Sequence, residues 1–315
     1  MAPETVYKLI DTISEYPEIE KVYLDDVNEP LIDPNTFGYI KALQGKGKKV
    51  NLATNGVLLG KQKIRDSLKK TVPDELLISV QTFTKEDFEK TRGTKINFGE
   101  YLNNIVDCIG EIYPFLDDGK FIRVEVAIHP GHRLRDRILG LGVSERSFYP
   151  DVEDLCTGVA HFLQLLNEHI SFPRQEVEEV VLHNIHLARR SKSHVKQIPI
   201  TSGLFIFLKH FVDWRNYYRG KKNYFVRCHA AELLIRANGD LIRCCNDFKG
   251  ETKMGNVFET PFQEIIERNF DIISKSLTGR PYWDVCLRCQ GQPTYRGALI
   301  GNLYSAIKNL RSKRR

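Results

Sequence analysis

The chain has 315 residues, of which 42% are hydrophobic, so it can bury one large core or two smaller ones. Its most apolar run, from Gly203 to Val212, is interrupted by Lys209 and is too short to span a membrane. The first residues contain no basic stretch followed by an apolar run, so they do not have the pattern of a signal peptide. We therefore expect a cytoplasmic protein without a membrane partner, in a compartment that keeps thiols reduced.

The net charge of +6 is concentrated at the C-terminus. Five of the last eight residues are basic: Lys308, Arg311, Lys313, Arg314 and Arg315. A short basic end of this kind is usually solvated, and the rest of the chain is close to neutral. Nucleic acid is therefore not an expected partner.

Helical and strand patterns alternate along the first 130 residues. The helical patterns cover residues 4–15, 35–43, 61–70 and 98–114. The strand patterns cover residues 22–27, 50–53, 76–82 and 121–128. Strands that alternate with helices across short turns predict right-handed crossovers and a parallel sheet covered by helices, an α/β fold.

The middle of the chain is richer in helix and in charge. Helical patterns at 152–169 and 174–190 indicate a helical insertion over about 131–202, after which 203–211 forms one more buried strand. The segment that follows has short strands and most of the cysteines, which indicates a second, smaller module. We predict three parts: residues 1–222, the module at 223–297, and a C-terminal helix with a basic tail at 298–315.

Four cysteines have the spacing of a metal site. Cys286 and Cys289 form a C-x-x-C turn, and the turn at Asn238–Gly239 would bring Cys228 and Cys244 to one end of a hairpin. Four thiolates suit either zinc or an iron–sulfur cluster. The other cysteines, including Cys108 and Cys156 on helical patterns, are expected to be core or packing residues.

The run CHAAELLIRANGDLIRCC, followed later by CLRC, resembles the SPASM/twitch extension of radical S-adenosylmethionine (SAM) enzymes. In that family a cysteine precedes Gly-x4-Cys, and Cys-x2-Cys follows after a gap. No cysteine follows Cys289, so the resemblance is to the twitch version. It implies one auxiliary [4Fe–4S] cluster on Cys228, Cys244, Cys286 and Cys289.

The N-terminal half contributes to the same resemblance. Asn28-Glu29-Pro30, Thr54-Asn55-Gly56 and Ile78-Ser79-Val80-Gln81 stand where radical SAM barrels have their cofactor motifs, although Asn28 replaces a glycine. The implied fold is a partial (β/α)6-type barrel followed by a small α+β iron–sulfur module. The implied SAM-binding residues are Glu29, Pro30, Asn55 and Ser79. No catalytic residue is predicted.

One part of the family pattern is missing from the 315 residues. Radical SAM chemistry needs a Cys-x3-Cys-x2-Cys loop after the first strand, and the first cysteine here is Cys108. We therefore expect an N-terminally truncated barrel without its first strand, and SAM as a cofactor only if such a loop precedes Met1. The alternative is a non-catalytic binding or partner protein with a four-cysteine zinc or iron–sulfur module.

For the complete form of the protein, the resemblance implies an oxidoreductase or an enzyme that modifies a small molecule or a peptide. The electron donor of an active form would be a protein such as flavodoxin or ferredoxin. The sequence contains no motif that identifies the substrate.

Overall fold

The computed structural model describes residues 1–24, 28–92, 96–128, 152–190, 196–210, 221–222, 224, 232–244, 247–277, 283–289, 295, 299 and 302–303. The chain divides into two compact units. One, which we call the sheet unit, contains residues 2–131 and 145–211; the other, the cysteine unit, contains Met1, 132–144 and 212–315. No helix among the described residues is both long and apolar enough to cross a membrane.

The sheet unit is built on a six-stranded sheet in the order β1-β2-β3-β4-β6-β5. Its strands are β1 (Lys21–Leu24), β2 (Lys49–Thr54), β3 (Glu75–Gln81), β4 (Phe121–Ile128), β5 (Lys196–Thr201) and β6 (Leu204–His210). All pairings are parallel except that of β5 with β6. The predicted α/β class with a parallel sheet is confirmed.

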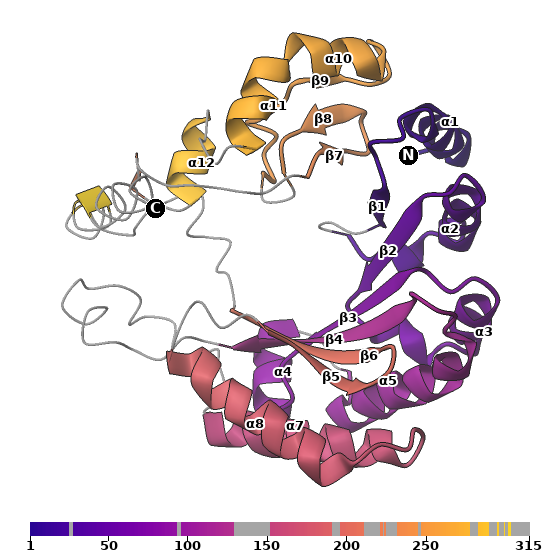
Figure 1. The fold of residues 1–315 in the computed structure, drawn as a ribbon, viewed down its shortest axis with the longest axis vertical. Coiled ribbons are helices and arrows are strands. Elements are labelled where there is room, and N and C mark those ends of the chain that lie inside the picture. Colours follow the sequence, from indigo (N-terminus) through magenta and orange to yellow (C-terminus); the bar gives the residue numbers. More distant parts are fainter. Residues whose placement is uncertain are drawn as a thin grey trace. The chain divides into compact units, whose positions relative to one another are not determined.

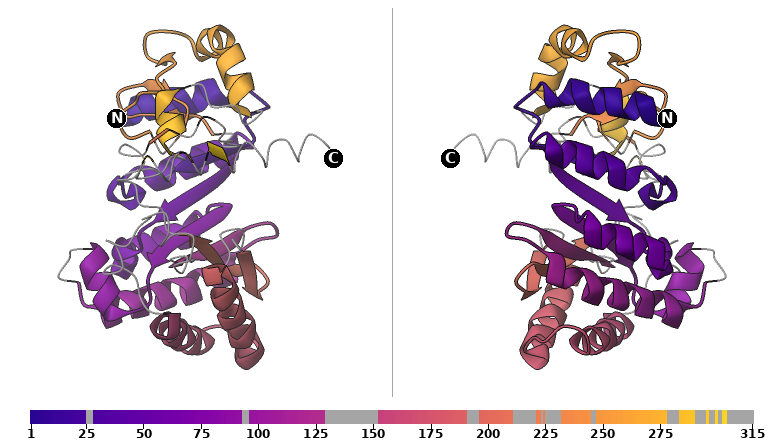
Figure 2. Two further views of the ribbon diagram at one scale, coloured as in Figure 1. Left: turned by 90° about the vertical axis from the view of Figure 1, so that its left-hand side faces the viewer. Right: turned by 90° about the vertical axis from the view of Figure 1, so that its right-hand side faces the viewer.

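Helices lie along one face of this sheet (Figure 1). The α-helices are α1 (Pro3–Ser14), α2 (Thr36–Gly45), α3 (Gln62–Lys70), α4 (Lys85–Arg92), α5 (Phe98–Ile112), α7 (Val152–Asn167) and α8 (Arg174–Arg190). Short 3-10 turns are η1 (Pro30–Ile32), η2 (Val57–Gly60) and η3 (Tyr113–Phe115). Figure 2 shows α1 at one end of the sheet and α7 and α8 at the other.

Side-chain alternation explains which face the helices cover. In β3, Leu76, Ile78 and Val80 are fully buried, whereas the residues between them point to the opposite face. Apolar residues on the covered face of each strand join the helices in one hydrophobic core. The opposite face carries polar side chains on several strands, and it is where the candidate site lies.

The segment predicted as a helical insertion ends differently from the prediction. Its helices α7 and α8 are present, but residues 196–201 form β5, which pairs antiparallel with β6. Ile198 and Ile200 are buried and alternate with exposed residues, a strand pattern. Pro199 is compatible with a strand only because β5 is at the edge of the sheet.

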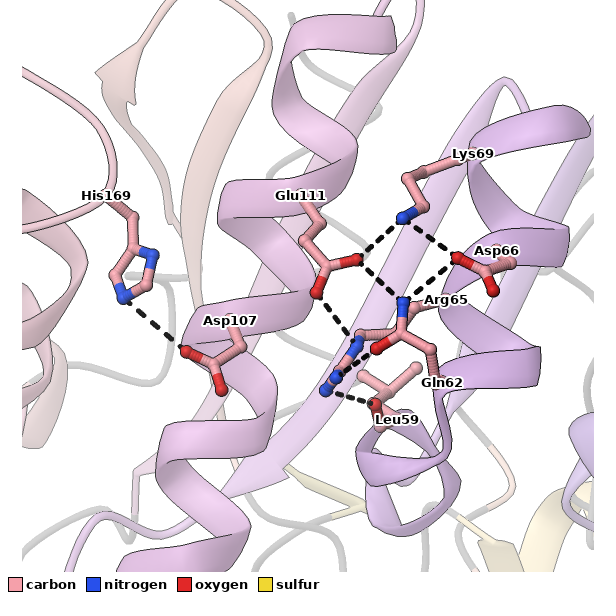
Figure 3. Close-up of polar contacts among 8 residues, drawn as sticks. All are labelled: Leu59, Gln62, Arg65, Asp66, Lys69, Asp107, Glu111 and His169. Atoms are coloured by element: carbon pink, nitrogen blue, oxygen red, sulfur yellow. Dashed lines mark hydrogen bonds and ion pairs between the residues drawn. The ribbon is translucent and has the colours of Figure 1, made fainter.

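A network of charged side chains joins α3 to α5 (Figure 3). Glu111 accepts a hydrogen bond from Lys69 at 2.8 Å and forms an ion pair with Arg65 at 3.1 Å. The hydrogen bond from Lys69 holds the pKa of the Glu111 carboxyl below its usual range. A separate contact of 3.5 Å joins Asp107, on the neighbouring turn of α5, to His169, which follows α7.

In its described residues, the cysteine unit contains a three-stranded antiparallel sheet in the order β7-β8-β9 and three helices. Its elements are β7 (Leu234–Ile235), β8 (Asp240–Ile242), β9 (Gly255–Asn256), α10 (Phe262–Arg268), α11 (Phe270–Leu277) and α12 (Asp284–Cys289). The predicted turn at Asn238–Gly239 joins β7 to β8, and Gly239 has a φ of 87° that suits glycine. Of the C-terminal helix and tail predicted at 298–315, only residues 299, 302 and 303 are among the described residues.

Candidate cofactor and metal sites

Glu29 and Asn55, predicted separately as SAM-binding residues, are brought together by the fold. The Glu29 carboxylate accepts hydrogen bonds from the Asn55 main-chain N–H at 2.7 Å and the Thr54 hydroxyl at 2.8 Å. It also caps η1 by accepting from the N–H of Leu31 at 3.2 Å, while Pro30 begins that turn. Because Thr54 ends β2, these bonds hold Glu29 at the carboxyl end of the parallel strands, where ligands of such sheets bind.

The turn after β2 is held in place from the other side by α5. The Tyr101 hydroxyl donates to the main-chain oxygen of Asn55 at 2.8 Å, and Tyr101 is almost fully buried. Gly56 has a φ of 81°, and a Cβ there would lie within 3.3 Å of Tyr101 and Ile105. The turn is therefore fixed both by backbone conformation and by packing.

Ser79 lies on β3 and takes part in a different polar group. Its hydroxyl donates to Glu125 on β4 at 2.8 Å, and the same carboxylate oxygen pairs with Lys209 on β6 at 2.6 Å. The Glu125 side chain is only 3% exposed, whereas that of Lys209 is 38% exposed. A buried carboxylate with a cation that reaches solvent can present one positive, hydrogen-bonding group to a ligand on this face of the sheet.

Two residues beyond Ser79, β3 ends in an unusual backbone conformation. Gln81 has a φ of 67°, the only positive value for a non-glycine residue in the part of the chain that the structure describes. The register with β4 shifts between Ser79 and Gln81, which marks a bulge. Such conformations cost about 1–3 kcal/mol and cluster at functional sites.

Glu125 and Lys209 were not predicted from the sequence, although a signal exists. Each is a charged residue in a largely apolar strand, FIRVEVAI or LFIFLKH, at a position on the face that the helices leave uncovered. A charge buried in such a strand needs a partner of opposite charge on a neighbouring strand. Tyr101 had no comparable signal, because its role depends on a contact between positions far apart in the chain.

Three of the four predicted metal ligands are described, and Cys228 lies outside the described residues. Cys244 follows β8, while Cys286 and Cys289 are three positions apart on α12. All three are partly exposed. Among the described residues, no group of three or more His, Cys, Asp or Glu side chains is close enough to hold a metal ion.

The donor set nevertheless has the chemistry of an iron–sulfur site. Residues three apart on a helix lie on the same face, so Cys286 and Cys289 project from one side of α12. Thiolates are the ligands that iron–sulfur clusters and zinc prefer. Cys244, Cys286 and Cys289 therefore carry donor groups that suit either centre.

Two other cysteines are core residues, as predicted. Cys108 is fully buried in α5, and Cys156 is 7% exposed in α7. Burial raises the pKa of Cys108 to about 12 and that of Cys156 to about 11. Both thiols are therefore protonated at neutral pH and unsuited to metal binding or redox chemistry.

The chain is similar to several solved structures, all at low identity. It shares 12% identity with "Native anSMEcpe with bound AdoMet", covering 99% of this chain and 89% of that one with a TM-score of 0.38. It shares 14% with Streptococcus suis SuiB bound to S-adenosylmethionine, covering 81% and 58% with a TM-score of 0.40. It shares 19% with TYW1 carrying a lysine-pyruvate adduct, covering 55% and 64% with a TM-score of 0.31.

The chain thus spans less than two thirds of the TYW1 and SuiB chains. No curated protein matches it.

The cysteine-rich segment, in contrast, matches a family profile directly: residues 228–290 match SPASM, described as an iron-sulfur cluster-binding domain. The match begins at Cys228 and includes Cys244, Cys286 and Cys289. The predicted SPASM resemblance of the cysteine-rich segment is thereby confirmed: residues 228–290 match a family of iron–sulfur cluster-binding domains.

Proposed function

We propose that this chain is a radical SAM-type iron–sulfur protein whose SPASM domain holds one auxiliary [4Fe–4S] cluster on Cys228, Cys244, Cys286 and Cys289. The observation that carries the proposal is the SPASM match, whose boundaries enclose these four cysteines. The two buried cysteines Cys108 and Cys156 lie outside the match. When bound, a cluster of this kind supplies one-electron transfer.

The sheet unit supplies the proposed SAM site. A carboxylate accepts about four hydrogen bonds, and the described residues donate three to Glu29. Glu29 therefore retains capacity to accept from a ligand ammonium such as the amino group of SAM. Asn55 lies beside it, and Ser79 with Lys209 would bind polar atoms of the ligand farther along the sheet. The substrate class we propose is a small molecule or a peptide, with an electron donor such as flavodoxin or ferredoxin.

SAM cleavage depends on a Cys-x3-Cys-x2-Cys loop, which is not among these 315 residues. Reading the DNA upstream of the codon for Met1 tests whether the gene encodes one. An upstream frame with these cysteines would support a truncated sequence and an active enzyme. An in-frame stop without them would support the alternative, a non-catalytic partner protein with a four-cysteine module.

The cluster itself is tested by anaerobic purification followed by iron, sulfide and zinc analysis and by visible absorbance. We expect a brown protein with about four iron atoms per chain. Cys286→Ala should remove most of the iron, whereas the matched control Cys156→Ala, in the buried core, should retain it. A colourless protein with one zinc per chain would contradict the cluster assignment and support the zinc-module alternative.

A further inference from the structure

A buried carboxylate organises the loop that carries Cys244. Asp247 is 2% exposed and accepts from the Thr252 N–H at 2.6 Å, the Thr252 hydroxyl at 2.7 Å and the Glu251 N–H at 3.0 Å. Its own N–H donates to the main-chain oxygen of Cys244 at 3.1 Å. The loop is therefore closed on itself, with Cys244 at its base.

The loop is also tied to β8. The N–H of Arg243, the residue before Cys244, donates to the Thr252 hydroxyl at 2.9 Å. Thr252 thus receives one bond from the start of the loop and gives one to Asp247. These bonds hold the N–H of Arg243 and the main-chain oxygen of Cys244, so Asp247 and Thr252 together hold the backbone of the residue that carries the thiol.

One ion pair joins this loop to the helix that carries the other two cysteines. Glu251, whose N–H is bound to Asp247, accepts a hydrogen bond from Arg288 at 2.5 Å. Arg288 stands between Cys286 and Cys289 on α12. The two side chains are 35% and 22% exposed, so the pair is less screened by solvent than a fully exposed one.

We propose that the Glu251–Arg288 ion pair is a positioning contact for the auxiliary cluster: it ties the loop that Asp247 closes to α12 and so holds Cys244 at a fixed place relative to Cys286 and Cys289. The inference rests on the proposed function, because it assumes that these cysteines bind one centre. The inference extends the proposed cluster site to residues that are not cysteines and that the spacing of the cysteines does not identify. Outer contacts that orient metal ligands typically change metal affinity about 10–100-fold.

The test is the rate at which reconstituted protein loses iron to an excess of a coloured iron chelator under anaerobic conditions. We compare wild type with Arg288→Glu, Glu251→Arg and the double variant that reverses the pair. Each single variant should lose iron about tenfold faster than wild type. The double variant should regain most of the retention, because it restores an ion pair between the same two positions.

Arg268→Glu is the matched control. It makes the same charge change in the same unit and breaks a pair with Glu264 inside α10, which connects no cysteine-bearing elements. Its iron loss should equal that of wild type. Circular dichroism and thermal unfolding of each variant show that the unit is folded.

Three results would overturn the inference: single variants that lose iron at the wild-type rate, a control that loses it as fast as they do, or a double variant no better than either single one. The proposed cluster fails separately, if the wild type binds zinc in place of iron. The same release measurement with a zinc-sensitive dye then tests the ion pair alone. A wild type that binds neither metal would overturn both proposals.

Discussion

Glu29 and Asn55 are 26 positions apart, and the Glu29 carboxylate accepts the Asn55 N–H at 2.7 Å. This bond joins the segment after β1 to the turn after β2 at the carboxyl end of the sheet. With the Thr54 hydroxyl on its other oxygen, Glu29 both shapes the turn and remains able to accept from a ligand. Glu29 is therefore the residue that joins these two segments of the candidate site.

Glu29→Gln should destabilise the sheet unit. The amide of glutamine replaces one carboxylate oxygen, an acceptor, with an NH2 group, a donor. That NH2 group then faces either the Asn55 N–H or the Thr54 hydroxyl, both of which donate to Glu29, so a partly buried donor loses its acceptor. We expect the free energy of unfolding to fall by about 1–3 kcal/mol in urea denaturation. Glu18→Gln, at an exposed residue, serves as the control and should change stability by less than about 0.5 kcal/mol. Equal stability of the two variants would contradict the role of Glu29.

Lys209→Met should be more harmful than the double variant Glu125→Gln/Lys209→Met. The single change leaves the nearly buried Glu125 carboxylate without its cation, at a cost of about 1–3 kcal/mol, given that Lys209 is partly exposed. Removing both charges relieves that cost. A double-mutant cycle by urea denaturation measures the coupling, and additive effects of the two changes would show that the pair is energetically unimportant.

Glu111→Gln should lower stability at neutral pH and have little effect in acid. Because the folded pKa of Glu111 is depressed, its stabilisation is present above the unfolded pKa of about 4.3 and is lost as the pH falls through the folded value. We expect a loss of about 0.5–1 kcal/mol at pH 7 that shrinks towards pH 3. The exposed Glu168 provides a control substitution to Gln. A loss that stays constant with pH would mean that the charge is not responsible.

Cys108 and Cys156 should resist alkylation in the native protein. With pKa values of about 12 and 11, both are thiols at pH 8, and their burial blocks the reagent. Peptide mapping after iodoacetamide treatment should find them modified only in urea. Rapid modification of either one in the folded protein would show that the surrounding helices open readily.

Gly158→Ala should disturb the loop that follows Gln81. A Cβ at position 158 of α7 would overlap the main-chain carbonyl of Phe83, so the helix or the loop must move. We expect a loss of about 1–3 kcal/mol by thermal or urea unfolding. Gly45→Ala, at the end of α2 with no atom near the added carbon, is the matched control and should be neutral or stabilising. Equal effects would refute the close approach.

The parallel strands were predictable because Leu76–Thr82 and Phe121–Ile128 are short, largely apolar stretches rich in β-branched residues that alternate with helical patterns. The edge strand β5 was not predictable, because Pro199 and the charged Lys196 at its start obscure the alternation of buried and exposed residues. The site residues were recognised one by one, but the bond between Glu29 and Asn55 and the sharing of Glu125 by Ser79 and Lys209 are long-range contacts. Local patterns carry no information on such contacts.

The β5–β6 pairing has a consequence for the order of folding. Only residues 202 and 203 separate these strands, whereas β4 ends at Ile128, far upstream of its partner β6. A hairpin closes within about 1–10 μs, much faster than a long crossover. During synthesis on a ribosome, the edge of β4 that pairs with β6 would remain unpaired until residues 196–210 emerge. The β5–β6 hairpin would then form first and pair with β4 as a unit. Until then, the unpaired edge of β4 can pair with another chain, which is a route to aggregation.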